Sequence, residues 1–340
     1  MNNEILSETG TIPLISNMSI NNGVMGYSSL PANNQANSIS CSDTTLGAET
    51  MYYQEREYIG YQHIQSFLPR FSPFNKKIAL FIISSSRVAT SSAQYDYGHK
   101  FNRDEMRKTI IRLPQTGNGE IDFDFMENFV AELEARRVAE LEAYLLATGL
   151  KDYALTEEER NALDNYKTLK WSTYNLEELF GKSTRGKRLK GDDRIAGTLP
   201  FVTAGEACEG ISAFIGNKVE IFESNTATID MFGSAKYRNY RYGADDHVAV
   251  VHTEKIAYKA AIFTTSAIHK AAHTGKFDYG HNFYAKDADA LDIMLPERDG
   301  LPDYKYMETL ISAIQKLVIK DVVLYADSKI AETKNIIQKR

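Results

Sequence analysis

The heptapeptide Phe277-Asp-Tyr-Gly-His-Asn-Phe283 decides the fold, because a close copy of it, Tyr95-Asp-Tyr-Gly-His-Lys-Phe101, stands earlier in the chain. The copies are 182 residues apart, and at the same offset Leu113-Pro114 recurs as Leu295-Pro296. A repeat of this length is too long for a solenoid unit and indicates a duplicated domain.

Further matches extend the repeat in both directions. The matched segments are Gly10-Thr-Ile-Pro13 with Gly197-Thr-Leu-Pro200 and Gly23-Val24 with Gly210-Ile211, both at an offset of 187, and Met126-Glu127 with Met307-Glu308 at 181. They stand in the same order, and a slowly drifting offset is what small deletions in surface loops produce. Each copy therefore has one plan: short strands and turns, a Leu-Pro pair, then a long helix.

Two long helices are predicted, one after each copy. Apolar residues recur at every third or fourth position from Met126 to Leu145, with Gly149 as the stop, and again within residues 303–337. The apolar stripes include Phe129, Leu133, Leu141, Tyr144, Leu310, Ile314, Leu317 and Tyr325. A single striped helix usually lies on its own domain, but two equivalent ones favour an antiparallel pair that holds two domains apart.

Two shorter features complete the predicted secondary structure. The apolar run Ile78–Ile83 and its counterpart Ala260–Thr265 predict one buried strand in each copy. Thr156-Glu-Glu-Glu159 is a capping box, which predicts a short helix running toward Tyr166.

The fold class that follows is α+β with pseudo-twofold symmetry: two tandem domains of mixed helix and strand, joined by two long antiparallel helices. The predicted boundaries are residues 1–121 for the first domain, 122–168 for the first long helix and a linker, 169–301 for the second domain and 302–340 for the second long helix.

The composition is that of a globular protein. With 340 residues, 43% of them hydrophobic, the chain can bury two cores, and its longest apolar run is far too short for a membrane helix. The N-terminus resembles no secretory signal, so the cytoplasm is the expected compartment. Cys41 and Cys208 stand far apart without a Cys-x-x-Cys pair, so we expect two buried thiols and neither a disulfide nor a zinc site.

The net charge of −6 hides an asymmetry along the chain. Residues 120–159 contain 12 acidic side chains against 3 basic ones, so the remainder of the chain is net positive. A negative average therefore does not exclude a partner that carries phosphates.

The sequence has no P-loop, dinucleotide-binding, zinc-protease or nucleophile-elbow motif. Pro302-Asp303 together with Glu332-Thr-Lys334 resembles the metal site of a restriction nuclease, in which two acids hold Mg²⁺. Here a helix would separate the two acids by about 40 Å. We therefore predict neither catalytic nor metal-binding residues.

Side chains of the kinds that contact DNA gather in both copies. Basic residues cluster within 100–112 and 182–194, and Lys236, Arg238 and Arg241 alternate with tyrosines. Charge runs are usually only solvated surface, but two such clusters in two copies of one domain favour binding. Asparagine and glutamine suit adenine, whereas arginine and lysine suit guanine.

His99 and His281 hold equivalent positions, each after a glycine. A histidine there can bond the backbone of a turn, can face DNA, or can do both.

The ordered set of motifs resembles the DNA specificity subunits of type I restriction-modification systems and of the related bipartite type IIB systems. The resemblance covers nearly the whole chain, and it depends on the order of the motifs because no single one is specific. The segments that carry it are 117–127, Trp171 to Lys182, Gly197 to Thr203, Asn225 to Tyr237 with Phe232-Gly233, Tyr279-Gly-His281, Leu295-Pro296 and the long helix that follows.

The resemblance implies a non-catalytic subunit that binds double-stranded DNA at a split recognition sequence, with one half-site for each domain. The two helices would set the number of unread base pairs and would dock methyltransferase subunits, or fused nuclease-methyltransferase subunits, two for each chain. Those partners would carry S-adenosylmethionine, methylate adenine and use Mg²⁺, while this chain would bind no cofactor.

The residues that we expect to contact DNA are Asn17, Asn21, Asn22, Tyr52, Gln54, His99 and Lys100 in the first domain, and Lys187, Arg188, Lys190, Lys236, Arg238, Arg241 and His281 in the second. Two alternatives stay open. One is a stand-alone Mg²⁺-dependent nuclease that uses Asp303, Glu332 and Lys334. The other is a two-lobed scaffold that binds proteins and no DNA.

The first domain departs from the family pattern at its start. Twenty-six residues, beginning with Trp171, precede Gly197, whereas only nine precede Gly10. The Leu-Phe element that opens the second domain is missing from the first, so we expect a different start, or completion by a partner or by the C-terminal tail.

Overall fold

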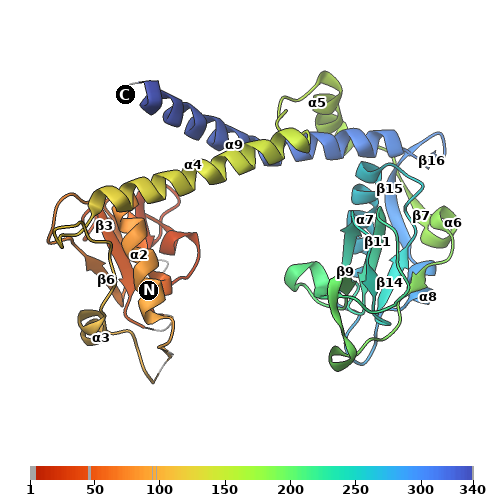
Figure 1. Ribbon diagram of the computed structural model, residues 1–340. Coiled ribbons are helices and arrows are strands. Elements are labelled where there is room, and N and C mark those ends of the chain that lie inside the picture. Colours follow the sequence, from red (N-terminus) through yellow and green to blue (C-terminus); the bar gives the residue numbers. More distant parts are fainter. Residues whose placement is uncertain (1–4, 45–46, 94, 97, 339–340) are drawn as a thin grey trace. The chain divides into compact units, whose positions relative to one another are not determined.

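A computed structural model describes residues 5–44, 47–93, 95–96 and 98–338, with side chains described as far as residue 333 (Figure 1). The chain divides into two units, residues 1–143 with 326–340 and residues 144–325, so the division falls inside both long helices. None of the helices in the described part of the chain has the length and the apolar character that crossing a membrane requires.

Unit 1 consists of two three-stranded sheets, with the orders β2-β1-β5 and β4-β3-β6, and one helix packed on the second of them. Its strands are β1 (Ile12–Ile15), β2 (Val24–Ser28), β3 (Ser38–Ser42), β4 (Tyr52–Gln54), β5 (Ile59–Gly60) and β6 (Ile64–Phe67). Its helices are α2 (Lys76–Thr90), α3 (Arg103–Lys108) and α4 (Phe123–Ala147), with the 3-10 turns η1 (Asn21–Gly23) and η2 (Gly47–Thr50). The core includes Ile39, Cys41, Ile83 and Phe101.

Unit 2 repeats these sheets as β10-β9-β13 and β12-β11-β14-β8, and it adds a third sheet, β16-β15-β7. Its strands are β7 (Trp171–Asn175), β8 (Thr184–Arg185), β9 (Ala196–Val202), β10 (Ile211–Ile215), β11 (Thr226–Asp230), β12 (Ala235–Arg238), β13 (Gly243–Ala244), β14 (Val248–Val251), β15 (Asp292–Arg298) and β16 (Leu301–Pro302). Its helices are α5 (Glu157–Asp164), α6 (Leu176–Phe180), α7 (Tyr258–Ala272), α8 (Ala285–Asp289) and α9 (Tyr304–Gln338), with the 3-10 turns η3 (Asn165–Thr168), η4 (Gly191–Asp193) and η5 (Ala207–Gly210).

The duplication extends to single hydrogen bonds. The Tyr53 hydroxyl donates to the Asn37 side chain at 2.9 Å, and the Tyr237 hydroxyl donates to Asn225 at 2.9 Å. Both asparagines have positive φ, as the turn before β3 and before β11 requires. The predicted α+β class, with two sheet-rich domains and long helices, is confirmed.

The strands predicted at Ile78–Ile83 and Ala260–Thr265 are wrong, because both runs lie in 15-residue helices, α2 and α7. A short apolar run does not distinguish a buried strand from a buried helix. The missed signal in unit 1 is the N-cap Asn75, whose side chain accepts hydrogen bonds from the N–H groups of Lys77 and Ile78.

The predicted helices after each copy are confirmed. Gly149 follows α4 with φ +69°, and Thr156 and Glu159 form the predicted capping box of α5. The first turns of each long helix lie on its own domain, since Met126 and Met307 are fully buried. Further along, Phe129, Leu133, Tyr144, Ile314, Leu317 and Tyr325 are 41–58% exposed. The packing of α4 against α9 stays a prediction.

The third sheet of unit 2 is held together through β7. Trp171 stacks on Phe263 of α7 at 6.2 Å between ring centroids, and residues 171–175 pair with 292–296. Glu297 fastens the start of β7: its carboxylate accepts hydrogen bonds from Lys170 Nζ at 2.7 Å and from Ser172 Oγ at 2.6 Å. These contacts lower the pKa of Glu297 from 4.5 to about 2, with the Lys170 bond as the largest cause.

A carboxyl whose pKa is lowered on folding stabilises the fold at neutral pH, and this contribution disappears as the pH falls from about 5 to about 2. We therefore expect Glu297→Gln to lower the stability of unit 2 at pH 7 and to weaken its dependence on pH in that range. Urea unfolding followed at several pH values checks this. Gln115→Glu is the matched control, because residue 115 holds the equivalent position in unit 1, where β7 has no counterpart among the described strands. A parallel pH dependence in Glu297→Gln and in the unchanged chain would contradict the assignment.

Candidate nucleic-acid interface

In each unit a loop connects the two longest strands of the first sheet, β1 to β2 in unit 1 and β9 to β10 in unit 2. We call the end of the unit that carries this loop the loop end. In unit 2 the helix α7 connects the loop end to α9: Lys259 near its start donates to Ser312 of α9 at 2.7 Å, and His273 after its last turn lies 3.2 Å from the Phe232 carbonyl. Fifteen helical residues span about 22 Å, so the loop end lies well away from α9.

The loop end of unit 1 is formed by η1, β4 and the last turn of α2. Asn21 and Tyr52 line one groove there together with Arg87 and Tyr95. Arg87 donates to the carbonyls of Ala48, Glu49 and Met51, and its guanidinium lies 5.9 Å from the centre of the Tyr52 ring. This arginine fixes the loop that flanks the groove.

Behind η1, Gln54 is almost fully buried, at 4% exposure. Its Nε2 donates to Ser40 Oγ at 2.9 Å and to the Asn22 carbonyl at 3.2 Å, while the Asn22 side chain donates to the Tyr53 carbonyl. Asn21 and Asn22 themselves are exposed, and both adopt positive φ. Gln54 therefore supports a strained loop with two exposed asparagines, and each amide nitrogen donates to a main-chain carbonyl, Asn21 Nδ2 to Val24 at 2.9 Å and Asn22 Nδ2 to Tyr53 at 3.2 Å.

Arg238 holds the same position in unit 2, and it is only 1% exposed. Its Nε donates to Thr228 Oγ1 at 3.0 Å, and its Nη1 donates to the Tyr240 hydroxyl at 2.9 Å. Thr226 and Thr228 of β11 face Arg238 and Lys236 of β12, just as Ser38 and Ser40 face Gln54 and Tyr52. The structure thus gives Gln54 and Arg238, both predicted DNA contacts, an internal role beneath the loop.

At the loop end of unit 2, Lys236 lies on β12, and His281 lies on the loop that packs against the β11–β12 turn. Lys236 Nζ is 3.2 Å from Glu206 beside η5 and 3.9 Å from Asp230. Tyr279, 86% exposed, packs its ring edge-on against Phe232. His273 and Tyr279 therefore flank the Phe232 turn, which precedes the strand that carries Lys236.

The histidine turns are built by aspartates. The Asp96 carboxylate accepts the N–H groups of Gly98 and His99, and the Asp278 carboxylate accepts those of Gly280 and His281. Neither glycine needs positive φ. The His99 ring packs on Tyr95 at 5.0 Å and the His281 ring on Phe277 at 5.3 Å, so both rings stay at the exposed surface.

The other basic residues are arranged in two places. The exposed Lys187, Arg188 and Lys190 lie on the β8–β9 connection, which is tied to β13 through the Lys187 N–H bond to Ala244. Arg241 lies in the connection between β12 and β13 and pairs with Glu223 at 3.2 Å, so it does not join the loop end. Asn17 and Lys100 are exposed in unit 1.

The sequence and the fold agree with one family of known proteins. Residues 1–143 match the family described as type I restriction modification DNA specificity domain. The specificity subunit S.BcgI of a type II restriction enzyme from Heyndrickxia coagulans is 23% identical over 282 residues, which cover 81% of this chain and 78% of that protein. The crystal structure of the type I restriction-modification S subunit from M. genitalium superposes with a TM-score of 0.59 at 14% identity, over 100% of this chain and 90% of that one.

The chain is similar to restriction-modification specificity subunits, and its residues 1–143 match their DNA specificity domain. Such subunits recognise DNA sequence and are non-catalytic, and the nuclease alternative finds no support. Asp303 is ion-paired with Arg298 at 2.8 Å, and Glu332 pairs with Lys329 near the far end of α9. Lys334 lies beyond the residues whose side chains are described.

Unit 2 also has an acidic group beside the β8–β9 connection. Asp245, Asp246 and His247 place possible ligand atoms within 4.8 Å of one another. Asp246 already pairs with His247 at 3.0 Å and with Arg188 at 4.0 Å, and Asp245 accepts the Leu189 N–H. These contacts hold the basic loop in place, and nothing further indicates a metal.

Several loop-end residues were not predicted from the sequence, namely Arg87, Cys208, Glu209, Phe232, His273 and Tyr279. A signal existed for two of them: the offset of 187 that equates Gly23 with Gly210 also equates Asn21 and Asn22 with Cys208 and Glu209. These two residues have the same positive φ as the asparagines. Cys208 is exposed, which corrects the prediction of two buried thiols.

Proposed function

We propose that this subunit reads a split DNA sequence, with one half-site bound at the loop end of each unit. One observation carries the proposal: the two loop ends share a scaffold but expose different side chains. η1 exposes Asn21 and Asn22 where η5 exposes Cys208 and Glu209. Because base edges are distinguished by the donors and acceptors that meet them, different side chains on one scaffold select different sequences.

Phosphate contacts would position each unit on the duplex. The exposed Lys187, Arg188 and Lys190 are the candidates in unit 2, and Lys100 is the candidate in unit 1. Contacts of this kind add affinity that depends on salt but carry no sequence information.

Specificity subunits assemble with methyltransferase subunits. We propose two such partners for each chain, either methyltransferases or fused nuclease-methyltransferases, docked on the exposed apolar residues of α4 and α9. S-adenosylmethionine and Mg²⁺ would be bound by these partners, since this chain carries no motif for either.

The test compares two variants of the assembled complex by mapping methylated sites on random DNA. We expect Asn21→Ala with Asn22→Ala to relax the sequence choice at one half-site by about 10- to 100-fold, because a bidentate base contact contributes about 1–3 kcal/mol of discrimination. The triple variant Lys187→Ala, Arg188→Ala and Lys190→Ala should keep the sequence choice and lower the slope of log affinity against log salt by roughly 3.

Lys255→Ala is the control for charge alone, because Lys255 precedes α7 on the side away from the loop end. Relaxation of both half-sites by the double asparagine variant would contradict separate reading by the two units. Methylation at a continuous rather than a split sequence would overturn the proposal as a whole.

A further inference from the structure

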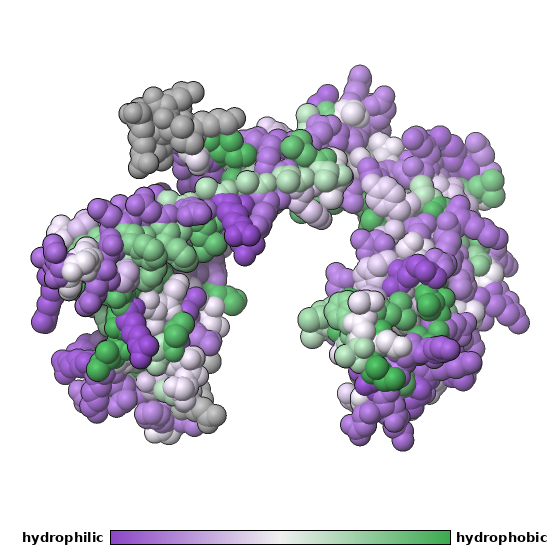
Figure 2. All heavy atoms as spheres, in the orientation of Figure 1, coloured by the Kyte–Doolittle hydropathy of each residue, from purple (hydrophilic) through white to green (hydrophobic). Residues whose placement is uncertain are grey.

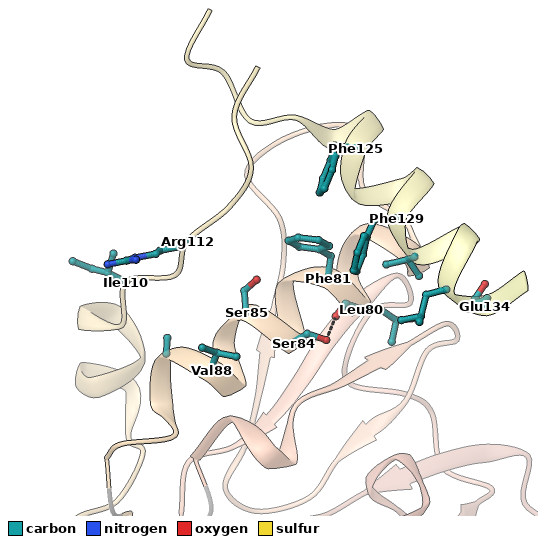
Figure 3. Close-up of a pocket in the computed structure, with 13 residues that line it drawn as sticks. Leu80, Phe81, Ser84, Ser85, Val88, Ile110, Arg112, Phe125, Phe129 and Glu134 are labelled. Atoms are coloured by element: carbon teal, nitrogen blue, oxygen red, sulfur yellow. Dashed lines mark hydrogen bonds between the residues drawn. The ribbon is translucent and has the colours of Figure 1, made fainter. Parts of the chain in front are cut away.

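Unit 1 carries an apolar groove at the place where unit 2 holds its third sheet. The groove has a volume of about 780 Å³ and is lined by Leu80, Phe81, Ile110, Arg112, Phe125 and Phe129, with neighbouring residues of α2 and α4. In Figure 3 the rings of Phe81, Phe125 and Phe129 point toward one another between the two helices, and Ile110 and Arg112 stand across from α2. We call it the α2–α4 groove.

The repeat shows what covers this surface in unit 2. At the offset of 182, Phe81 corresponds to Phe263, on which Trp171 of β7 stacks at 6.2 Å. At the offset of 181, Phe129 corresponds to Leu310 of α9. Leu310 is 3% exposed, whereas Phe129 is 49% exposed. Hydrophobic atoms gather where α4 meets the globular part of unit 1 in Figure 2, so a surface that is covered in one copy is open in the other.

The backbone beside the groove lacks its strand partner as well. Residues 110–114 correspond to 292–296 of β15, which pair with all five residues of β7. In the described part of unit 1, nothing hydrogen-bonds to the main chain of residues 110–113, and no strand forms there. The hairpin that follows is kept, since Gln115 bridges Ile121 as Glu297 pairs with Pro302. Ile110 in this segment is 86% exposed. An exposed large apolar side chain next to unpaired main-chain groups is typical of a surface that binds a partner.

The described segments of this chain are already engaged elsewhere. Near the N-terminus, the Ser7 N–H donates to the Tyr27 carbonyl, and Leu6 packs over Gly26 of β2. The chain stays helical through Gln338 at the other end. In a second copy, β7 is held by its own ladder and by Glu297, so it is not free to serve another molecule.

We propose that the methyltransferase subunit donates an extended segment to the α2–α4 groove and so completes unit 1. This proposal rests on the proposed function in its choice of partner. The segment adds a strand to residues 110–114, antiparallel as β7 is to β15, and inserts an aromatic side chain against Phe81.

The groove also specifies the charge of the segment. Trp171 pairs with Pro296, and Thr173 pairs with Met294. In unit 1 these positions are Pro114 and Arg112. The residue two places after the aromatic side chain therefore faces Arg112, where an aspartate or glutamate makes a favourable cross-strand pair. The motif on the partner is an aromatic residue, any residue, and then an acidic one.

Two measurements on the co-purified complex of full-length proteins test this. Amide hydrogen exchange within residues 110–113 is expected to slow at least tenfold when the methyltransferase subunit is bound, whereas residues 292–295 are protected with or without it. A photo-reactive benzoylphenylalanine in place of Ile110 should cross-link to one segment of the methyltransferase that contains the motif. The same probe in place of Asp292, the equivalent residue of unit 2, should cross-link only to this chain's own β7.

The outcomes separate this proposal from the proposed function. A complex that methylates a split site while residues 110–113 exchange as fast as in the chain alone would overturn strand donation and leave DNA reading intact. A cross-link from position 110 to a second copy of this chain would overturn it as well. If no methyltransferase co-purifies and no site-specific methylation is found, both the proposed function and strand donation are contradicted.

Discussion

Leu295→Ala is expected to lower the free energy of unfolding of unit 2 by about 3 kcal/mol, within the range of 2–5 kcal/mol for large-to-small changes in a core. Leu295 is fully buried on β15, in the cluster that contains Ile293 and Met307. Its neighbours are fixed on two sides by β7 and α7, so the cavity cannot close by collapse.

Leu113→Ala is the matched control, because Leu113 holds the equivalent place in unit 1 but is only partly buried, with no β7 counterpart beside it. We expect this change to cost about 1 kcal/mol or less in the chain alone. Denaturant unfolding with amide exchange of α7 and α2 assigns each loss to its unit. Equal losses in the two variants would mean that the third sheet does not brace unit 2.

The second large effect is expected from Arg238→Ala. The change removes a buried guanidinium and leaves Thr228 Oγ1 and the Tyr240 hydroxyl without the bonds that it donated. Losing hydrogen bonds to a buried charged group costs about 3 kcal/mol. Gly210 of η5 lies close to the guanidinium, so we also expect weaker recognition of the half-site that unit 2 binds.

A double variant that imitates unit 1 tests whether Arg238 supports the loop or contacts DNA. Arg238→Gln with Thr228→Ser reproduces the pair Gln54 and Ser40, which makes the same hydrogen bond in unit 1. It should recover most of the stability and of the half-site recognition that Arg238→Ala loses, measured by thermal unfolding and by methylated-site mapping. Recovery of stability without recognition would show that Arg238 acts directly on DNA.

Features that repeat along the chain could be predicted well from the sequence. The duplication, the helices α4 and α9 and the capping box of Thr156 each rest on a pattern of many residues or on a local rule. The strands predicted at Ile78 and Ala260 failed because six apolar residues fit either structure. A helix is distinguished from a strand here only by its length, since α2 continues beyond the apolar run from Ser84 to Thr90.

The candidate site was predicted less well, because exposure is decided by tertiary packing. Lys236 and Arg238 are two residues apart on one strand and look alike in the sequence, yet Lys236 is partly exposed and pairs with Glu206, whereas Arg238 is buried beside Tyr240 and Tyr242. Similarly, Gln54 is drawn into the core by Ser40, a partner 14 residues away. Neither contact can be predicted from the spacing of residues along the chain.

The unequal environments of the two cysteines give this protein a built-in attachment point. Cys41 is fully buried, and burial raises the pKa of its thiol to about 12, so the reactive thiolate is scarce at neutral pH. Cys208 is exposed in η5. A thiol-reactive fluorophore will therefore label Cys208 in the loop of unit 2 without any substitution. Its fluorescence will report DNA binding by unit 2 alone, because unit 1 stays unlabelled.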